Sequence, residues 1–485
     1  MKPLNRIVKG VLIALTAILV LVPIALPRVL GASAQRAYQD LLRSAVDSLP
    51  AGWVLVERYD RGWFRSHATA ELTRQTADHP VFAPGLKHIR LDSRIDQGPW
   101  AWLSAGFGGG PFPVAARVRT RVEWIDAPLP LPPLILTTSV GANGAGRTHL
   151  LIPAPDQTTE QATEEAANQT QPRDAYRLHG KTITGTVDFS LNPRQAQVDL
   201  RIPDLALSNP AGPAASLTDA QLRAQLTDWA GGLFSGYANL DIAAARFTAA
   251  PQAGSQTGAP PNETILERLT LRLDQVPEGE APTLRLGLRL NASAQQLRLR
   301  GNDYQSPVIG LSAQSLDVRT LTEIIFGVRI LMSDTATPAE RGVAGLTLVA
   351  QVLPRFLAAG PSIKINPLTM STTDGPVAGH LAIAAVNHGS GSNGTAALLG
   401  ALLGGGPETL LSGDGELALP RPVAVNWLAG TDTAARSAAT AQLQEWIDGG
   451  WVTASDNRVT SALRIDRGKL TINGKRAPLR FSAGR

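Results

Sequence analysis

The heptapeptide LRLGLRL, residues 284–290, places a leucine at every second position, with arginine or glycine between. A period of two puts all the leucines on one face of a β-strand and the arginines on the other. An α-helix would scatter the same leucines around its axis. The heptapeptide therefore predicts a strand with one apolar face and one polar face.

The same alternation recurs in residues 114–124, 182–191 and 377–385. Strands with a single apolar face are typical of antiparallel sheets, whereas buried parallel strands are continuously apolar. The 46 glycines and 35 prolines interrupt the chain often, which favours strands and turns. We therefore predict a mainly β fold of extended or curved antiparallel sheets. Helical spacing of apolar residues predicts a few helices, near residues 316–332, 338–359 and 433–448.

Linker composition suggests how the chain is divided. A polar segment rich in threonine, glutamine and glutamate covers residues 153–175, and it is the predicted domain boundary. It separates an N-terminal β-rich region, 51–152, from a C-terminal β-rich region, 176–485. Glycines followed by alternating strands recur in the second region without a fixed period, which predicts a meander.

The amino terminus predicts the compartment. A positively charged segment, residues 1–9, precedes an apolar run near the about 20 residues that cross a bilayer. This order predicts a cytoplasmic amino terminus, a transmembrane signal-anchor over residues 10–30, and a bulk of the chain outside, which is the periplasm in a bacterium. A small-residue site at Ala32–Ala34 makes a cleaved signal peptide the alternative. Residues 35–49 then predict an amphipathic stalk helix.

Composition excludes several classes of site. The absence of cysteine excludes disulfides, thiolate metal sites, cysteine nucleophiles and a lipid-modified cysteine. The net charge of +5 is spread along the chain without a block of like charges. We therefore expect no nucleic-acid partner.

The sequence contains no motif for catalysis or cofactor binding in a suitable structural context. The seven histidines show no metal-ligand spacing, and nucleophile-elbow and phosphate-loop motifs are absent. GSGSNG (389–394) fits the dinucleotide-binding pattern G-x-G-x-x-G. However, a helix after it would have only about nine residues, and the next segment is strand-like, unlike a βαβ unit. Glu164 and Glu165 fall in the polar linker. We predict no catalytic residue, no cofactor and no metal, and expect a protein that is not an enzyme.

Three short segments carry a family resemblance. YDRGWFRSHATAEL (59–72), IDQGPW (95–100) and GKLTINGKRAPL (468–479) resemble motifs of the YdgA-like family of bacterial inner-membrane proteins of unknown function. Gln97 stands where that family has histidine. The matching residues are Tyr59, Arg61, Gly62, Ser66, Ala68, Leu72, Gly98, Pro99, Asn473, Gly474 and Lys475. The resemblance implies an inner-membrane anchor and a periplasmic body, without a known activity.

The charged segment 57–72 has three interpretations. Alternation on both sides of Asp60-Arg61-Gly62 predicts a β-hairpin whose charges point away from the apolar face, with Gly62 at a positive φ. It is then a structural corner. A binding edge and a catalytic cluster are the alternatives.

Three functions fit the sequence. The first is a non-enzymatic, anchored envelope protein whose β-rich body binds lipid, an envelope component or a protein partner, and it requires too few helices to cover the apolar sheet faces. The second is a structural scaffold that packs on itself or on an identical subunit. The third is an envelope hydrolase whose carboxylates converge only in the folded chain.

Overall fold

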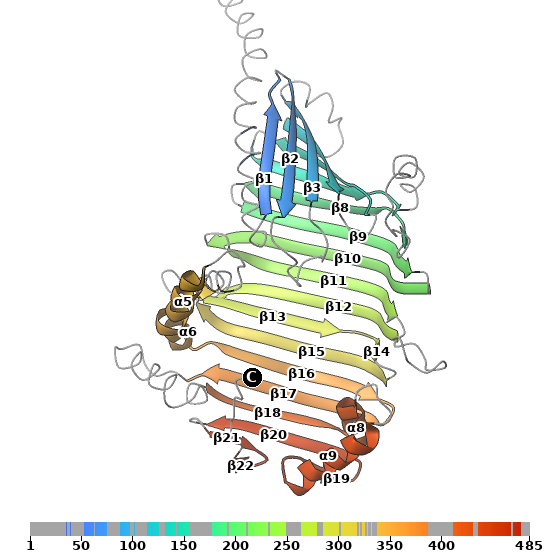
Figure 1. Cartoon of the computed structure of the whole chain (residues 1–485), viewed down its shortest axis with the longest axis vertical. Helices are drawn as coiled ribbons and strands as arrows, with labels where there is room; N and C mark the ends of the chain where they lie inside the picture. Colours follow the sequence, from blue (N-terminus) through green and yellow to red (C-terminus); the bar gives the residue numbers. More distant parts are fainter. Residues whose placement is uncertain are drawn as a thin grey trace, which may run out of the picture. The chain divides into compact units, whose positions relative to one another are not determined.

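The structure is a computed structural model of the chain (Figure 1). It describes residues 35, 39, 53–62, 64–74, 88–97, 101, 114–125, 131–141, 143–155, 177–191, 194–209, 212–230, 233–248, 263–278, 285–299, 302–317, 320, 323–324, 327, 331, 337–386, 411–429, 435–466 and 469–476. The predicted anchor, the Ala32–Ala34 site, GSGSNG and the pair Gly98-Pro99 lie outside these residues. Within the described part, no helix has the length and apolar character needed to span a membrane.

The chain forms two compact units, Met1–Pro210 and Ala211–Arg485. This division differs from the boundary predicted at residues 153–175. The strand before this polar segment, β6 (Ala145–Ile152), pairs in antiparallel register with β8 (Ile183–Leu191). The short strand that directly follows the segment pairs with a later strand of the same unit. The polar segment therefore connects strands of one unit.

Unit 1 contains an antiparallel sheet in the order β1–β2–β3–β4–β5–β6–β8–β9, with β7 on β9. The remaining strands are β1 (Trp53–Asp60), β2 (Arg65–Arg74), β3 (His88–Gln97), β4 (Val114–Trp124), β5 (Leu134–Gly141), β7 (Arg177–Gly180) and β9 (Arg194–Asn209). One face of β2–β4 is buried, and it includes Ala68, Ala70 and Ile95. Gln35 and Gln39, in the predicted stalk, are helical, and the Gln39 amide donates to Glu57 of β1 at 3.0 Å.

Unit 2 contains the order β10–β11–β12–β13–β15–β16–β17–β18–β20–β21–β22, and every neighbouring pair is antiparallel. Its strands are β10 (Gly212–Ala230), β11 (Leu233–Thr248), β12 (Glu263–Glu278), β13 (Arg285–Ser293), β14 (Gln296–Leu299), β15 (Asn302–Asp317), β16 (Ser362–Thr372), β17 (Gly375–Ala385), β18 (Leu411–Pro420), β19 (Thr453–Ser455), β20 (Arg458–Asp466), β21 (Lys469–Ile472) and β22 (Lys475–Arg476). The predicted antiparallel, mainly β fold is confirmed.

The helices of unit 2 form two groups at opposite ends of its strands (Figure 1). One group is α5 (Pro338–Thr347), the π-helical turn η4 (Leu348–Val352) and α6 (Leu353–Ala358); the other is α8 (Arg421–Ala429) and α9 (Arg436–Asp448). The first group matches the helix predicted at 338–359, and α9 matches the one at 433–448. The helix predicted from residue 316 starts too early, because Leu316 is still in β15. Helix α8 was not predicted.

Helix α5 begins with a reciprocal cap. The Thr337 backbone N–H donates to the Glu340 carboxylate at 2.7 Å, and the Glu340 N–H donates to the Thr337 hydroxyl at 3.2 Å. The hydrogen bond from the Thr337 backbone, with a second one from its hydroxyl, lowers the pKa of Glu340. This capping box satisfies N–H groups that the first turn of a helix otherwise leaves without an acceptor.

Residues at a positive φ keep the apolar residues of the long strands on one face. Arg268 in β12 has a φ of 48°, and it stands where the apolar spacing changes from two to three, between Leu266 and Leu269. The pairing with β11 keeps its register across Arg268, so both strands make the three-residue step together. Without this step every later side chain would turn to the opposite face. Asp219, Ser306 and Ser315 have φ values of 43°, 48° and 57°, and the pairing shifts by one residue near the last two, as in a bulge.

The positive φ at Arg268 provides a test of this constraint. Glycine adopts a positive φ without strain, whereas valine there costs about 1–2 kcal/mol. We expect Arg268→Val to lower the free energy of unfolding by about that amount and Arg268→Gly to stay close to the wild type, as measured by urea denaturation. Equal stability of the two variants would show that the left-handed conformation at this position is no constraint.

Candidate functional site

A row of ten apolar residues crosses the sheet of unit 2, one residue from each of ten strands. Direct register partners link them from β10 to β21. The members of this central row are Ala224, Ala238, Leu273, Leu290, Leu311, Ile365, Leu381, Gly415, Leu463 and Ile472. Nine strand spacings of about 4.8 Å make the row about 43 Å long.

The two rows beside the central row are also apolar. One runs through Leu240, Ile309 and Leu368, and the other through Leu288, Ile363 and Ile383. Gln275 and Ser461 are the polar side chains in these two rows, within the registers from β10 to β21. The three rows together form what we call the apolar face.

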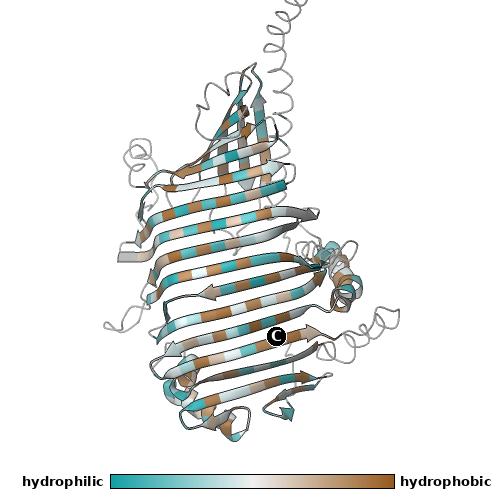
Figure 2. Cartoon of the chain, turned by 180° about the vertical axis from the view of Figure 1, so that it is seen from behind, coloured by the Kyte–Doolittle hydropathy of each residue, from teal (hydrophilic) through white to brown (hydrophobic). Residues whose placement is uncertain are grey.

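The opposite face of the same strands is polar. Its row behind the central one contains Gln225, Tyr237, Asp274, Arg289, Ser312, Lys364, Ala382, Asp414, Arg464 and Thr471. Arg272 forms an ion pair with Asp274 at 3.0 Å and lies over the Tyr237 ring. Figure 2 shows the resulting alternation of hydrophilic and hydrophobic positions along the strands.

The large side chains of the central row are not buried. Its buried members are Ala224 and Gly415, which are among the smallest. Leu273 is 37% exposed, and in the apolar face beside it Ile363 is 51% exposed and Ile309 40%. A closed sandwich would remove such side chains from water, because a second layer would pack on them. The apolar face is therefore an open hydrophobic surface in the described part of unit 2.

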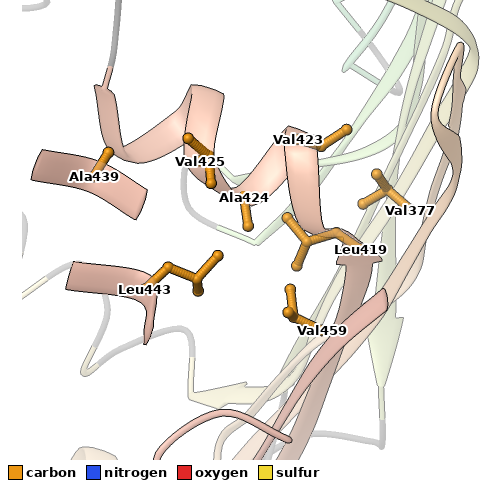
Figure 3. Close-up of a cluster of buried hydrophobic side chains, with 8 residues drawn as sticks. All are labelled: Val377, Leu419, Val423, Ala424, Val425, Ala439, Leu443 and Val459. Atoms are coloured by element: carbon orange, nitrogen blue, oxygen red, sulfur yellow. The ribbon is translucent and has the colours of Figure 1, made fainter. Parts of the chain in front are cut away.

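The helices cover the ends of this surface. At one end, Val423 of α8 and Leu443 of α9 pack against Val377, Leu419 and Val459 of the sheet (Figure 3). At the other end, Phe356 of α6 packs against a small cluster formed by Leu286, Ala313 and Leu316. Neither cluster includes a residue of the central row.

A pocket of about 560 Å³ lies between α8, α9 and the sheet. It is lined by Leu417, Leu419, Ala424, Trp427, Leu428, Leu443, Trp446, Trp451, Val452, Val459, Thr460, Ser461 and Ile472, none of which is charged. Its volume falls in the range of about 300–1,000 Å³ that is usual for small-molecule sites. The Trp427 indole N–H donates to the Tyr304 hydroxyl at 2.9 Å, which fixes one wall of the pocket on β15.

The Asn473-Gly474-Lys475 segment holds another wall of this pocket. Asn473 and Gly474 have φ values of 49° and 80°, which makes them the two-residue turn of a β21–β22 hairpin. The Asn473 side chain accepts from the Ala462 N–H at 2.8 Å and donates to the Trp451 carbonyl at 2.9 Å. Lys475 donates to the Gly449 carbonyl at 2.7 Å. The loop that carries Trp451 and Val452 is thus tied to the hairpin.

The first hairpin of unit 1 forms a packed corner. Ser66, Ala68 and Leu72 of β2 are buried, and Tyr59 of β1 lies opposite Ala68. The Gln97 amide is fully buried and donates to the Gly62 carbonyl at 3.2 Å. This hydrogen bond joins the turn at Asp60-Arg61-Gly62 to the segment around Gln97, and its two residues are 35 positions apart in the sequence.

Gly62 corrects one expectation about this corner. Its φ is not positive; instead, a Cβ at Gly62 would lie 1.9 Å from the Arg65 carbonyl oxygen. The glycine is required because the backbone approaches closely, not because the turn is left-handed.

The charges of segment 57–72 pair across strands on the other face. Arg65 bonds to Asp96 at 2.8 Å, His67 lies 2.9 Å from Asp92, and Glu71 accepts from Arg90 at 2.8 Å. The hydrogen bond from Arg90 lowers the pKa of Glu71. These pairs are exposed, and exposed pairs contribute little to stability. The many charges of segment 57–72 are therefore explained by pairing between neighbouring strands on a face that is in contact with water.

A comparison with known protein families assigns the chain to a family. The model of a bacterial protein family of unknown function, DUF945, matches residues 8–480. The chain belongs to the DUF945 family. No curated protein and no solved structure matches the chain. For this DUF945 protein, the YdgA-like name, the membrane anchor and any binding activity stay predictions.

The sequence motifs and the open surface of this DUF945 protein fall in different places. Asn473, Gly474 and Lys475 lie beside the tryptophan-lined pocket, whereas Tyr59, Arg61, Gly62, Ser66, Ala68 and Leu72 form the corner of unit 1. In the described part, no three His, Asp or Glu side chains gather as metal ligands would.

Sequence reasoning missed most of the apolar face. It found several strands with strict alternation, but not β10, β11, β12, β16 or β20. In β16, Asn366-Pro367 separates Ile365 from Leu368, and the pairing with β15 shifts there, so both stay on the apolar face. A search that allows one three-residue step in an alternating pattern would have found the first four of these strands. No motif indicated the cluster of Trp427, Trp446 and Trp451.

Asn473 provides a test of the tie between hairpin and pocket. Asn473→Gly keeps the positive φ but removes both side-chain hydrogen bonds, each worth about 0.5–1.5 kcal/mol. We expect a lower free energy of unfolding and a red-shifted tryptophan emission, because Trp451 loses its support. Thr471→Ala, on the opposite face of β21, is the control and should leave the emission unchanged. An unshifted emission in Asn473→Gly would show that the side chain does not position this loop.

Proposed function

We propose that this DUF945 protein is a non-enzymatic envelope protein whose apolar face in unit 2 binds the acyl chains of lipids. The proposal is carried by the central row, in which ten register-linked residues are apolar and none of the large ones is buried by the described residues. Water against such a surface is unfavourable by about 25 cal/mol per Å² of apolar area. A hydrocarbon chain along the row would remove that contact.

The chemistry of the face favours hydrocarbon over a protein surface. A protein interface usually forms about one hydrogen bond per 100–200 Å². The three rows offer few side-chain partners for such bonds, since Gln275 and Ser461 are their polar members. Strand pairing also uses the backbone groups of the interior strands. An acyl chain needs no hydrogen bonds, and each methylene it buries contributes about 0.8 kcal/mol.

The length of the face suits lipid. The hydrocarbon core of a bilayer is about 30 Å thick, so one extended acyl chain covers about half of that distance. A row of about 43 Å accommodates such a chain at full length with room for further chains. The helices at the two ends of the strands border this surface on both sides.

We place the protein at the bacterial inner membrane, with its β-rich units in the periplasm. The basis is the sequence of residues 1–30, in which a positive segment precedes a long apolar run. An anchor there would keep the apolar face close to a source of lipid.

A pair of adjacent substitutions tests lipid binding. Leu311 lies in the central row, and Ser312 follows it on the polar face, opposite Arg289 and Lys364. Leu311→Glu places a charge against hydrocarbon, which costs several kcal/mol, whereas Ser312→Glu gains cross-strand partners. We expect native mass spectrometry in mild detergent to find lipid on the wild type and on Ser312→Glu, and at least about tenfold weaker retention on Leu311→Glu, corresponding to about 1.4 kcal/mol.

Two results would contradict lipid binding. One is a wild-type protein that carries no lipid under these conditions. The other is equal lipid retention by Leu311→Glu and Ser312→Glu, because the two variants have the same charge and differ in the face that carries it. If the wild type is lipid-free and forms a dimer that Leu311→Glu dissociates, an identical subunit covers the face instead.

The location can be measured separately. A phosphatase that is active only outside the cytoplasm, fused after Arg485, should be active in intact bacteria. The fusion protein should also stay in the membrane pellet after an alkaline carbonate wash, because the apolar run is retained as an anchor. Release by the wash would identify a cleaved signal peptide, and an inactive phosphatase would contradict export.

A further inference from the structure

We infer that the tryptophan-lined pocket beneath α8 and α9 is a specific site for the methyl end of one acyl chain whose remaining length lies on the apolar face. This inference rests on the proposed function, and it adds a defined end point and a direction to lipid binding. Trp427, Trp446 and Trp451 contribute aromatic walls to the pocket, and the sheet contributes its aliphatic floor.

The pocket is continuous with the apolar face. Ile472 is the last member of the central row and also lines the pocket. Leu417 and Ser461 belong to the row beside it and line the pocket as well. A chain that follows the central row toward β21 therefore reaches the pocket without crossing a polar strip of the sheet.

The lining determines which end of a lipid enters. It contains no charged side chain, and two of its polar side chains are hydrogen-bonded within the protein. The Trp427 N–H donates to Tyr304 at 2.9 Å, and the Ser461 hydroxyl donates to the Trp451 carbonyl at 3.2 Å. A phosphate or carboxylate placed here would lose its hydration without a compensating partner. The methyl end of the chain has no such cost, so the headgroup lies away from the pocket.

The exposure of the aromatic walls indicates that none of the described residues fills the pocket. Trp427 is 43% exposed and Trp446 is 36% exposed. Large aromatic side chains gain the most from being covered, because each offers an apolar area of about 150–250 Å². An acyl end between these side chains and Leu428 would cover them.

Brominated fatty acids test both the site and the direction. Bromine quenches tryptophan fluorescence on contact, so full-length protein in mild detergent is titrated with two 16-carbon fatty acids, brominated near the methyl end or near the carboxylate. We expect stronger quenching by the methyl-end bromine. This excess should shrink in Trp427→Phe, Trp446→Phe and Trp451→Phe, while Trp124→Phe in unit 1 should preserve it.

A second variant distinguishes occupancy from nearby binding. Val452→Phe fills the pocket from its loop and leaves all tryptophans in place. It should abolish the excess quenching but not the lipid retained in native mass spectrometry. Equal quenching by the two fatty acids, or stronger quenching by the carboxylate-end bromine, would overturn the pocket assignment while retained lipid still supports the apolar face. A protein that retains no lipid at all would instead overturn the proposed function.

Discussion

Antiparallel pairing in a fixed register is the constraint on which the rest of unit 2 depends. Because side chains alternate across a strand, a slip of one residue would move a whole set of leucines to the opposite face. The pairings that join Leu290, Leu311 and Ile365 place them in one row, and the row continues through ten strands. The open apolar face, the polar face behind it and the pocket at its end all follow from this register.

The two units use the same alternation for different results. In unit 1 one face of β2–β4 is buried, and it combines small or polar residues such as Ala70, Ser93 and Gln97 with Ile95. Ser93 and Thr120 are 2.9 Å apart through their hydroxyls. In unit 2 the apolar face carries leucine and isoleucine and stays open in the described residues. Cover, rather than strand pairing, makes one face a packed corner and leaves the other an open apolar surface.

Unbroken alternation predicted strands at residues 284–290 and 377–385, among others. Long strands such as β12 were not predicted, because one residue at a positive φ, such as Arg268, changes the spacing that a two-residue pattern requires. The sequence placed a boundary at the polar segment 153–175, since linker composition carries no information about whether the strands on its two sides belong to one unit. The motif Asn473-Gly474-Lys475 was recognised in the sequence, but its contact with the Trp451 loop was not, because that contact joins residues 22 positions apart.

The sequence by itself determined that this protein is a mainly β chain of alternating strands with few helices, because alternation is a local property of each strand. Only the tertiary structure decided that the apolar faces of ten strands align in one row. It also decided that α8 and α9 cover one end of that face and that Trp427, Trp446 and Trp451 line one pocket there. These features depend on register and on contacts between residues far apart in the chain, and no local pattern records them.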